Sequence, residues 1–516
     1  MMSKLIKSAL VLIFLTAISK VFGFGRDVIL AYKYGVSYIS DAFTIAFSIP
    51  SILFEGFTMA VLSCYIPVYN EMKRNEANEI NRFNSNLINT LLIINLLFII
   101  LFEFFSSDIT RMFALGFDKK TLDITIKLSE IIIVSTLFMT VSRVMQSVLQ
   151  ANEQFFTTGI MSIVFNVFII LGILFSTEKE YYILAFGVIL GYFSWIIVFL
   201  PSVRRVGFRY IPFYINFKDK NLRKLIIMVL PVFLGTIANQ LNTIIDKTMA
   251  STLAIGSVSA LNYANKLTML VKGMLISSVV MVIFPNISID MINNDIDKVK
   301  KTTINSMTIL SIIIIPLTIG CIVLAEPIVK LLFYRGAFDK VALSLTSESL
   351  VFYSISILAV GYSEILCKVF YSMHDTKTPM INAFISIVIN IILNFLLIKS
   401  LKHMGLALST SISSIVACIL LFVSLRKKIG SFGVKNMMKS LLKMVLSSLV
   451  MGVLVSIMYI KFTNFFPNNT LYLLLNIICT IGVGSIIYFM LLRLLKLKEI
   501  DFFIVIIKKF AKKLER

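Results

Sequence analysis

Runs of apolar residues alternate with short polar connectors along the whole chain. A helix needs roughly 20 apolar residues to cross about 30 Å of hydrocarbon, and most of these runs reach that length. The pattern predicts an all-α polytopic membrane protein of about fourteen transmembrane helices. The expected helix cores are 5–31, 39–66, 86–106, 125–149, 157–176, 181–201, 225–253, 258–287, 303–325, 342–370, 380–399, 404–425, 440–461 and 470–494.

Composition agrees with this pattern and narrows the partners. Of 516 residues, 58% are apolar and 15% are charged, whereas a soluble domain is about half apolar and about a quarter charged. The formal net charge of +22 lies mostly in connectors and in the C-terminal tail. We therefore expect anionic lipids of the inner leaflet, and not nucleic acid, as the partner of this charge. The five cysteines show no metal-site spacing and are interpreted as packing residues.

The basic connectors predict the orientation in the membrane. One such connector follows the sixth expected helix and the other follows the twelfth; they hold Arg204, Arg205, Arg209, Lys218, Lys220, Arg223 and Lys224, and Arg426, Lys427, Lys428, Lys435, Lys439 and Lys443. Both connectors are even-numbered, so the positive-inside rule puts them and both termini in the cytoplasm. The N-terminal apolar stretch lacks a small-x-small cleavage signature and is expected to remain as the first helix. The tail, 496–516, has the pattern of a basic amphipathic helix on the inner leaflet.

Short internal matches indicate a repeat. Ser162-Ile-Val-Phe-Asn166 resembles Ser386-Ile-Val-Ile-Asn390 at an offset of 224, and Phe117-Asp118 recurs as Phe338-Asp339 at an offset of 221. Two lobes of six helices each would enter the membrane in the same direction, which is a parallel repeat found in transporters. The expected organisation is an N-lobe at 1–224, a C-lobe at 225–428, two further helices at 429–495 and the tail at 496–516.

Charged residues inside the expected spans are the candidate functional residues. Each costs about 3 kcal/mol at a helix centre unless it is paired or hydrated. Lys20, Arg26, Asp41, Asp246 and Lys266 all fall in the four helices that the repeat brings to the interface of the lobes. A cationic group formed by Lys20, Arg26 and Lys266 suits a ligand with clustered negative charge, such as a diphosphate. The alternative is that these residues pair with neighbours or extend to the membrane interface.

Absent motifs exclude several mechanisms. No Gly-x4-Gly-Lys-[Ser/Thr] loop occurs, so ATP hydrolysis by a P-loop is excluded. Only two histidines, His374 and His403, are present; both fall in expected loops and are predicted to face solvent. We therefore expect a transporter and not an enzyme. Gly23, Gly25 and Pro50 are predicted to bend the first two helices.

Several motifs resemble the MurJ (MviN) family of lipid II flippases, which belongs to the multidrug/oligosaccharidyl-lipid/polysaccharide exporter superfamily. They are Ser19-Lys-Val-Phe-Gly-Phe-Gly-Arg-Asp27, Ser40-Asp-Ala-Phe-Thr-Ile-Ala-Phe-Ser-Ile-Pro50, Ser259-Ala-Leu-Asn-Tyr-Ala-Asn-Lys-Leu267, Phe333-Tyr-Arg-Gly-Ala-Phe-Asp339 and Phe370-Tyr-Ser-Met-His-Asp-Thr-Lys-Thr-Pro379. The motifs span most of the chain and occur in the order that the family has them.

The resemblance implies functional residues, with departures. It implies substrate-binding roles for Lys20, Arg26, Lys266 and Asp41, although the family often has Arg at positions 20 and 266. An arginine pair that usually follows the helix-two proline is missing. The resemblance also implies a sodium site, the only cofactor expected, at Asp246, Asn390, Asn394 and Thr410. Asn394 replaces a family carboxylate, so one anionic ligand is lost.

The predicted function is to carry undecaprenyl-diphosphate-linked peptidoglycan precursor from the inner to the outer leaflet of the bacterial inner membrane, by alternating access driven by the membrane potential or an ion gradient. Cell-wall synthesis proteins are further expected partners. Two alternatives are a flippase for another polyprenyl-diphosphate glycan and a cation-coupled drug antiporter, for which a cationic site is a poor match. A third is an inactive scaffold for wall synthesis, which would need no charge in its spans.

Overall fold

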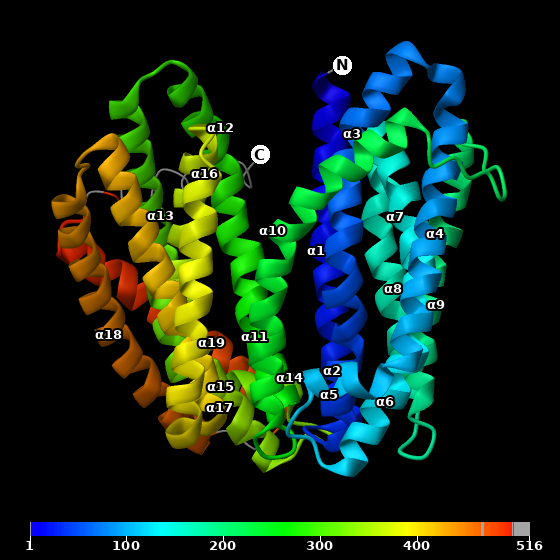
Figure 1. Cartoon of the computed structure of the whole chain (residues 1–516). Helices are drawn as coiled ribbons and strands as arrows, with labels where there is room; N and C mark the ends of the chain where they lie inside the picture. The colour runs from blue at the N-terminus through cyan, green and yellow to red at the C-terminus, as the bar shows by residue number, and fades with distance from the viewer. Residues whose placement is uncertain (1, 466–468, 498, 500–516) are drawn as a thin grey trace. The chain divides into compact units, whose positions relative to one another are not determined.

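The computed structural model of the chain consists of helices joined by short connectors (Figure 1). It describes the backbone of residues 2–465, 469–497 and 499, and the side chains of these residues except 2–14, 55, 234–239, 241, 282, 464 and 465. No strand occurs among the described residues. Contacts divide the chain into two compact units, 1–262 with 335–342, and 263–334 with 343–516.

Ten α-helices lie entirely within the first unit. They are α1 (Met2–Tyr34), α2 (Tyr38–Pro50), α3 (Gly56–Asn75), α4 (Ile80–Phe104), α5 (Ser106–Phe113), α6 (Lys119–Ile133), α7 (Ser135–Ala151), α8 (Phe155–Phe175), α9 (Tyr182–Arg205) and α10 (Lys220–Ser251). A π-helical segment, η1 (Ser51–Glu55), joins α2 to α3, and a short 3-10 helix, η2 (Ala77–Glu79), precedes α4.

The second unit contains the remaining helices, of which α11 and α15 each begin in the first unit and continue into the second. They are α11 (Ser257–Val271), α12 (Ser277–Ile292), α13 (Ile296–Val323), α14 (Ala325–Phe333), α15 (Lys340–Ser354), α16 (Ile357–Ser372), α17 (Lys377–Ile429), α18 (Val434–Phe465) and α19 (Thr470–Leu494). A second π-helical segment, η3 (Lys272–Ile276), joins α11 to α12. Two buried apolar clusters hold α12, α13, α16 and the later helices together.

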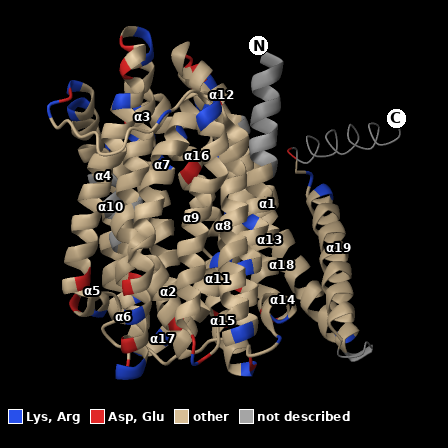
Figure 2. Cartoon of the chain, turned by 90° about the vertical axis from the view of Figure 1, so that its right-hand side faces the viewer, with Lys and Arg blue, Asp and Glu red and all other residues tan. Residues whose placement is uncertain are grey.

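The polytopic membrane architecture is confirmed. The number of helices that qualify as membrane spans is smaller than the fourteen predicted. Among the described residues, ten helices are long and apolar enough to cross a membrane, or up to eleven if the bent pair α15 and α16 forms one span. Neither α1 nor α10 is in this set, and α17 counts once although it covers two expected spans. Charged residues gather at helix ends, and few lie along helix centres (Figure 2). The count of fourteen spans and the lobe boundaries stay predictions, and the tail beyond Glu499 lies outside the described residues.

Three local features differ from expectation. The short helices α5 and α14 were not predicted, because neither contains an apolar run long enough to cross a membrane. The expected loop before His403 is a single break in α17 at Lys402, where φ is 50° and ψ is −129°. His403 is 5% exposed and its Nε2 lies 3.2 Å from Oε2 of Glu348, so the prediction that it faces solvent is wrong. The acidic partner is distant in sequence, and only tertiary packing reveals it.

The predicted bends differ between the two helices. Helix α1 continues through Gly23 and Gly25 without a change of helix type. After Pro50, by contrast, α2 passes into the π-helical segment η1. A π-helical turn inserts an extra residue into the helical hydrogen-bond pattern and is frequent at functional sites.

Secondary-structure features recur along the chain at the offset of the sequence repeat. The π-helical segment η1 starts at Ser51 and η3 starts at Lys272, 221 positions later. Gly35 and Gly256, both with positive φ, precede α2 and α11 at the same offset. Glu153 and His374, with φ of 60° and 57°, follow α7 and α16 at the same offset. These features are properties of the backbone conformation. Chance similarity among apolar side chains therefore does not explain their recurrence.

The repeated Phe-Asp pair marks two helix starts. Asp118 is the N-cap of α6, where its Oδ2 accepts a hydrogen bond from the Lys120 N–H at 3.2 Å. Asp339 accepts one from the Ala342 N–H at 2.8 Å at the start of α15. An aspartate at this position satisfies N–H groups that the first turn leaves open. Hydrogen bonds, chiefly from the Thr121 hydroxyl, hold the pKa of Asp118 below its usual value.

Helices α8 and α9 lie side by side and approach closely through two glycines (Figure 1). A Cβ atom added to Gly172 would lie 2.8 Å from the Cα of Gly187. Small residues permit this close backbone contact in membrane helices, where packing drives association. We expect Gly172→Ala to force the helices apart and lower stability by about 1–3 kcal/mol, measured as a lower thermal unfolding temperature in detergent.

Gly320→Ala on α13 is the matched control for this prediction. Nothing lies within 4 Å of a Cβ added to Gly320. Alanine also has a higher helix propensity than glycine. The control should unfold at or above the wild-type temperature. Equal unfolding temperatures for Gly172→Ala and wild type would contradict the close-packing interpretation.

Candidate functional site

Three predicted charged residues lie on α1 in the first unit. Lys20 and Arg26 are half-buried, and Asp27 is 4% exposed. The Arg26 guanidinium donates to Oδ1 of Asp27 from Nη2 at 2.9 Å and from Nε at 3.1 Å. Arg26 therefore forms an ion pair with the next residue in the chain, as one of the two interpretations of the sequence expected. Burial makes this ion pair important, since removing one partner leaves an uncompensated charge in an apolar surrounding.

Pairing with Asp27 does not use the whole guanidinium of Arg26. An arginine carries five N–H donors, and the bonds to Asp27 engage one on Nε and one on Nη2. The carbon centre of the guanidinium also lies 5.3 Å from the ring centroid of Phe47 on α2, within cation–π range. Asp27 and Phe47 thus fix the orientation of Arg26, while other N–H groups remain for an anionic ligand.

Asp41 connects α2 to the start of α11. Its side chain is buried, and its Oδ2 accepts a hydrogen bond from the Gly256 N–H at 2.6 Å. Its Oδ1 accepts from the Ser259 N–H at 2.7 Å and from the Ser259 hydroxyl at 2.6 Å. Gly256 has φ of 91°, and a Cβ there would lie 2.8 Å from the Val36 carbonyl oxygen, so glycine permits the approach. Both carboxylate oxygens are used in this arrangement, which sequence reasoning did not predict.

The acidic residue of α10, Asp246, lies beside other polar groups of the first unit. Its Oδ2 accepts a hydrogen bond from the Asn242 amide at 3.4 Å. The next residue, Lys247, donates to the Thr44 carbonyl oxygen of α2 at 3.5 Å. This long contact connects α10 to α2.

The remaining predicted residues belong to the second unit. Lys266 is half-buried on α11. Asn390, Asn394 and Thr410 form one cluster on α17, and both asparagines are buried. The Asn394 amide donates to Oδ1 of Asn390 at 3.1 Å, and the Asn390 amide lies 3.5 Å from the Thr410 hydroxyl.

This cluster is a poor fit for sodium. Sodium needs oxygen ligands, but Oδ1 of Asn390 already accepts a hydrogen bond and both amide N–H groups point into the cluster. All three residues of the cluster are uncharged. Among the described residues, no group of three or more His, Cys, Asp or Glu is placed to hold a metal ion. We assign no transport step to sodium.

Restoring a carboxylate tests this interpretation. We expect transport by the wild-type protein to change less than about twofold when Na⁺ is replaced by K⁺ at constant ionic strength. Asn394→Asp adds an anionic oxygen at the position where the family has one, and it should introduce a sodium dependence. Transport into vesicles with each salt measures both. A strong sodium dependence of the wild type would contradict the poor fit.

Two further charged groups lie against aromatic rings. Arg143 on α7 is buried, donates to Oε1 of Gln146 at 2.9 Å and lies 5.0 Å from the Trp195 ring centroid. The ammonium of Lys368 on α16 lies 5.1 Å from the ring centroid of Phe284 on α12. Aromatic partners of this kind cannot be found by i,i+4 spacing.

The fold and these residues define a multi-pass membrane protein that holds charged side chains within apolar helices, a feature of membrane transporters. Residues 30–476 match the family model described as "Lipid II flippase MurJ". The chain therefore belongs to the MurJ family.

Individual relatives agree over nearly their whole length. A "Probable lipid II flippase MurJ" of Buchnera aphidicola subsp. Baizongia pistaciae is 29% identical over 460 residues, covering 88% of this chain and 90% of the relative. The protein of the same name from Buchnera aphidicola subsp. Acyrthosiphon pisum is 28% identical over 513 residues, covering 97% and 99%. The family assignment thus applies to the full length of the chain.

Solved structures agree on the fold. A structure of "Lipid II flippase MurJ, inward closed conformation" matches with a TM-score of 0.80 and 28% identity, over 95% of this chain and 100% of that one. An inward-facing multidrug resistance MATE family transporter of the MOP superfamily matches with a TM-score of 0.64 and 13% identity, over 82% and 96%. The second likeness shows a shared fold alone.

Proposed function

We propose that this protein flips lipid II, the undecaprenyl-diphosphate-linked peptidoglycan precursor, from the inner to the outer leaflet of the bacterial inner membrane. The observation that carries the proposal is the half-buried Arg26, held by Asp27 and Phe47 with N–H donors left over, in a chain of the MurJ family. A cation that is costly in a membrane helix and oriented by its neighbours suits the binding of phosphate.

The proposed substrate site consists of Lys20, Arg26 and Lys266, which together bind the diphosphate. Arg26 supplies directed N–H groups and the two lysines supply mobile point charges. The long isoprenoid chain stays in the hydrocarbon during the movement, so the protein has to shelter only the polar headgroup. Asp41, predicted as a fourth substrate-binding residue, joins α2 to the start of α11 through both of its carboxylate oxygens.

Alternating access between two lobes is the proposed mechanism. Support comes from the recurrence of π-helical segments and positive-φ residues at one offset, as expected for a parallel repeat with lobes at 1–224 and 225–428. Further support comes from the basic connectors, which favour cytoplasmic termini. The membrane potential drives an anionic headgroup outward and returns the emptied cationic site inward, about 2.3 kcal/mol per charge for each 100 mV crossed.

Depletion of the protein in its own host tests the substrate. We expect lipid II to accumulate on the inner leaflet, because synthesis continues while export stops, and mass spectrometry of lipid-linked intermediates would measure it. Depletion of an unrelated membrane transporter of the host is the control. Accumulation of another polyprenyl-diphosphate glycan alone would assign the chain to that substrate and refute the lipid II proposal.

A further inference from the structure

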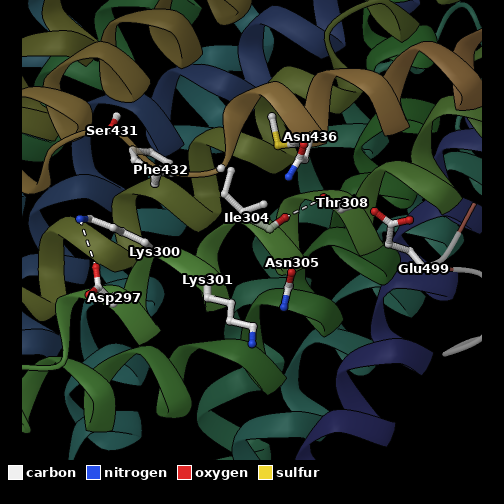
Figure 3. Close-up of a pocket in the computed structure, with 12 residues that line it drawn as sticks. Asp297, Lys300, Lys301, Ile304, Asn305, Thr308, Ser431, Phe432, Asn436 and Glu499 are labelled. Atoms are coloured by element: carbon white, nitrogen blue, oxygen red, sulfur yellow. Dashed lines mark hydrogen bonds and ion pairs between the residues drawn. The ribbon is translucent and has the colours of Figure 1, made fainter.

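A polar pocket of about 430 Å³ lies in the second unit, away from every residue discussed above as a site. Three parts of the chain line it: the first turns of α13, the connector from α17 to α18 with the start of α18, and Glu499 after α19 (Figure 3). The α13 side supplies Lys300, Lys301 and Asn305, and the α18 side supplies Ser431 and Asn436. The pocket is therefore rich in hydrogen-bond donors.

The two carboxylates of the pocket are already engaged. Asp297 is 94% exposed, and its Oδ1 lies 3.4 Å from the Lys300 ammonium. Oε1 of Glu499 accepts a hydrogen bond from the Ser440 hydroxyl at 2.9 Å. Lys301, in contrast, has no ion-pair partner among the residues that the structure describes. Figure 3 shows Lys301 and Asn305 next to each other on α13, with Asn436 on the α18 side.

The position of the pocket along α13 corresponds to the membrane interface. Lys300 and Lys301 precede the apolar run 309–323 of α13, and at 1.5 Å per residue they lie about 12–14 Å, or just over two helical turns, before it. Headgroups of phospholipids occupy this level, beside the hydrocarbon. The side chains of Met438 and Leu442 on α18, beside the pocket, are apolar and exposed. The acyl chain of a bound lipid could pack against them.

We propose that this pocket binds the phosphodiester headgroup of an anionic phospholipid of the cytoplasmic leaflet. Lys301 and Lys300 contact the phosphate, and the amides of Asn305 and Asn436 donate to its oxygens. Two lysines and two carboxylates balance in the lining, and Asp297 pairs with Lys300, so Lys301 is the main positive contact for a ligand. One such contact suits a singly charged phosphodiester better than a diphosphate. The basic residues of the α17–α18 connector draw anionic lipid to this face.

Binding of dihexanoylphosphatidylglycerol to the full-length, delipidated protein in neutral detergent tests the proposal. Saturable binding, followed by the rise in unfolding temperature, is expected for the wild type. The Lys300→Gln/Lys301→Gln double variant should raise the apparent Kd about tenfold or more. Unfolding temperatures without lipid check that the variant is folded. The readout is binding and not flipping, so failure here leaves the proposed transport function intact.

Lys298→Gln is the matched control. Lys298 lies in the same helical turn, pairs with Asp295 at 2.6 Å and does not line the pocket, so its replacement should leave the Kd within about twofold. Dihexanoylphosphatidylcholine should bind several-fold more weakly, since its own cation opposes the lysines. Wild-type affinity in the double variant would overturn the proposal. So would an equal loss in Lys298→Gln, or equal binding of glycerol 3-phosphate, which would indicate free phosphate and not a lipid.

Discussion

Lys20→Ala, Arg26→Ala and Lys266→Ala should each abolish complementation of a strain depleted of its own flippase, with transport in vesicles reduced about 10- to 100-fold. Each change removes one of the three cations proposed to hold the diphosphate, and a charge-assisted bond in a poorly hydrated site contributes about 1.5–3 kcal/mol or more. Immunoblots of membrane fractions would show whether the variants accumulate. Wild-type growth with all three substitutions would refute the proposed substrate site.

Lys127→Ala is the control for a lysine lost from a membrane helix. Lys127 is exposed on α6, lies outside the proposed site and should complement fully. A loss of function equal to that of the site variants would indicate a general need for positive charge.

The Arg26–Asp27 ion pair allows a sharper form of the same test. Arg26→Ala leaves Asp27 buried without its partner, which alone would destabilise the protein. The Arg26→Ala/Asp27→Asn double variant removes both charges. If Arg26 binds substrate, this variant should regain membrane abundance and stay inactive. Recovery of transport by the double variant would show that Arg26 serves only to neutralise Asp27.

Replacing Lys20 and Lys266 by arginine should retain much of the transport activity, whereas replacement by glutamine should lose most of it, about tenfold or more. The reason is that the proposed role of these lysines needs positive charge: arginine keeps the charge and adds a fork of donors that fits phosphate, and glutamine keeps only neutral hydrogen bonding. Flipping of labelled precursor, normalised to protein in the membrane, measures the difference.

A structural role for the two lysines predicts a different pattern. If they extend to the interface or pair with acidic neighbours, glutamine would be tolerated where water reaches the site, and activity would follow protein abundance. Equal activity of the glutamine and arginine variants at both positions would therefore show that transport does not use these charges.

The sequence determined the class of the protein and its helical framework. Apolar runs of membrane-spanning length fixed an all-helical membrane fold, because hydrocarbon offers the backbone no other hydrogen-bond partner. The repeated Phe-Asp pair indicates a repeat, and the structure shows that both aspartates lie at helix starts, where they accept local N–H hydrogen bonds. The family motifs identified the family of the chain, because a motif is recognised from the order of its residues and needs no information about how the helices pack.

Tertiary structure alone decided which polar groups meet. The carboxylate of Asp41, a predicted substrate ligand, accepts hydrogen bonds from Gly256 and Ser259, which lie more than 200 positions away in the sequence. His403, expected in a loop, is buried on α17, where Glu348 from another helix lies against it. The pocket beside Lys301 needs α13, the start of α18 and Glu499 together. Periodicity reports contacts one or two helical turns apart, whereas these partners are brought together by packing between helices, for which a single sequence carries no local signal.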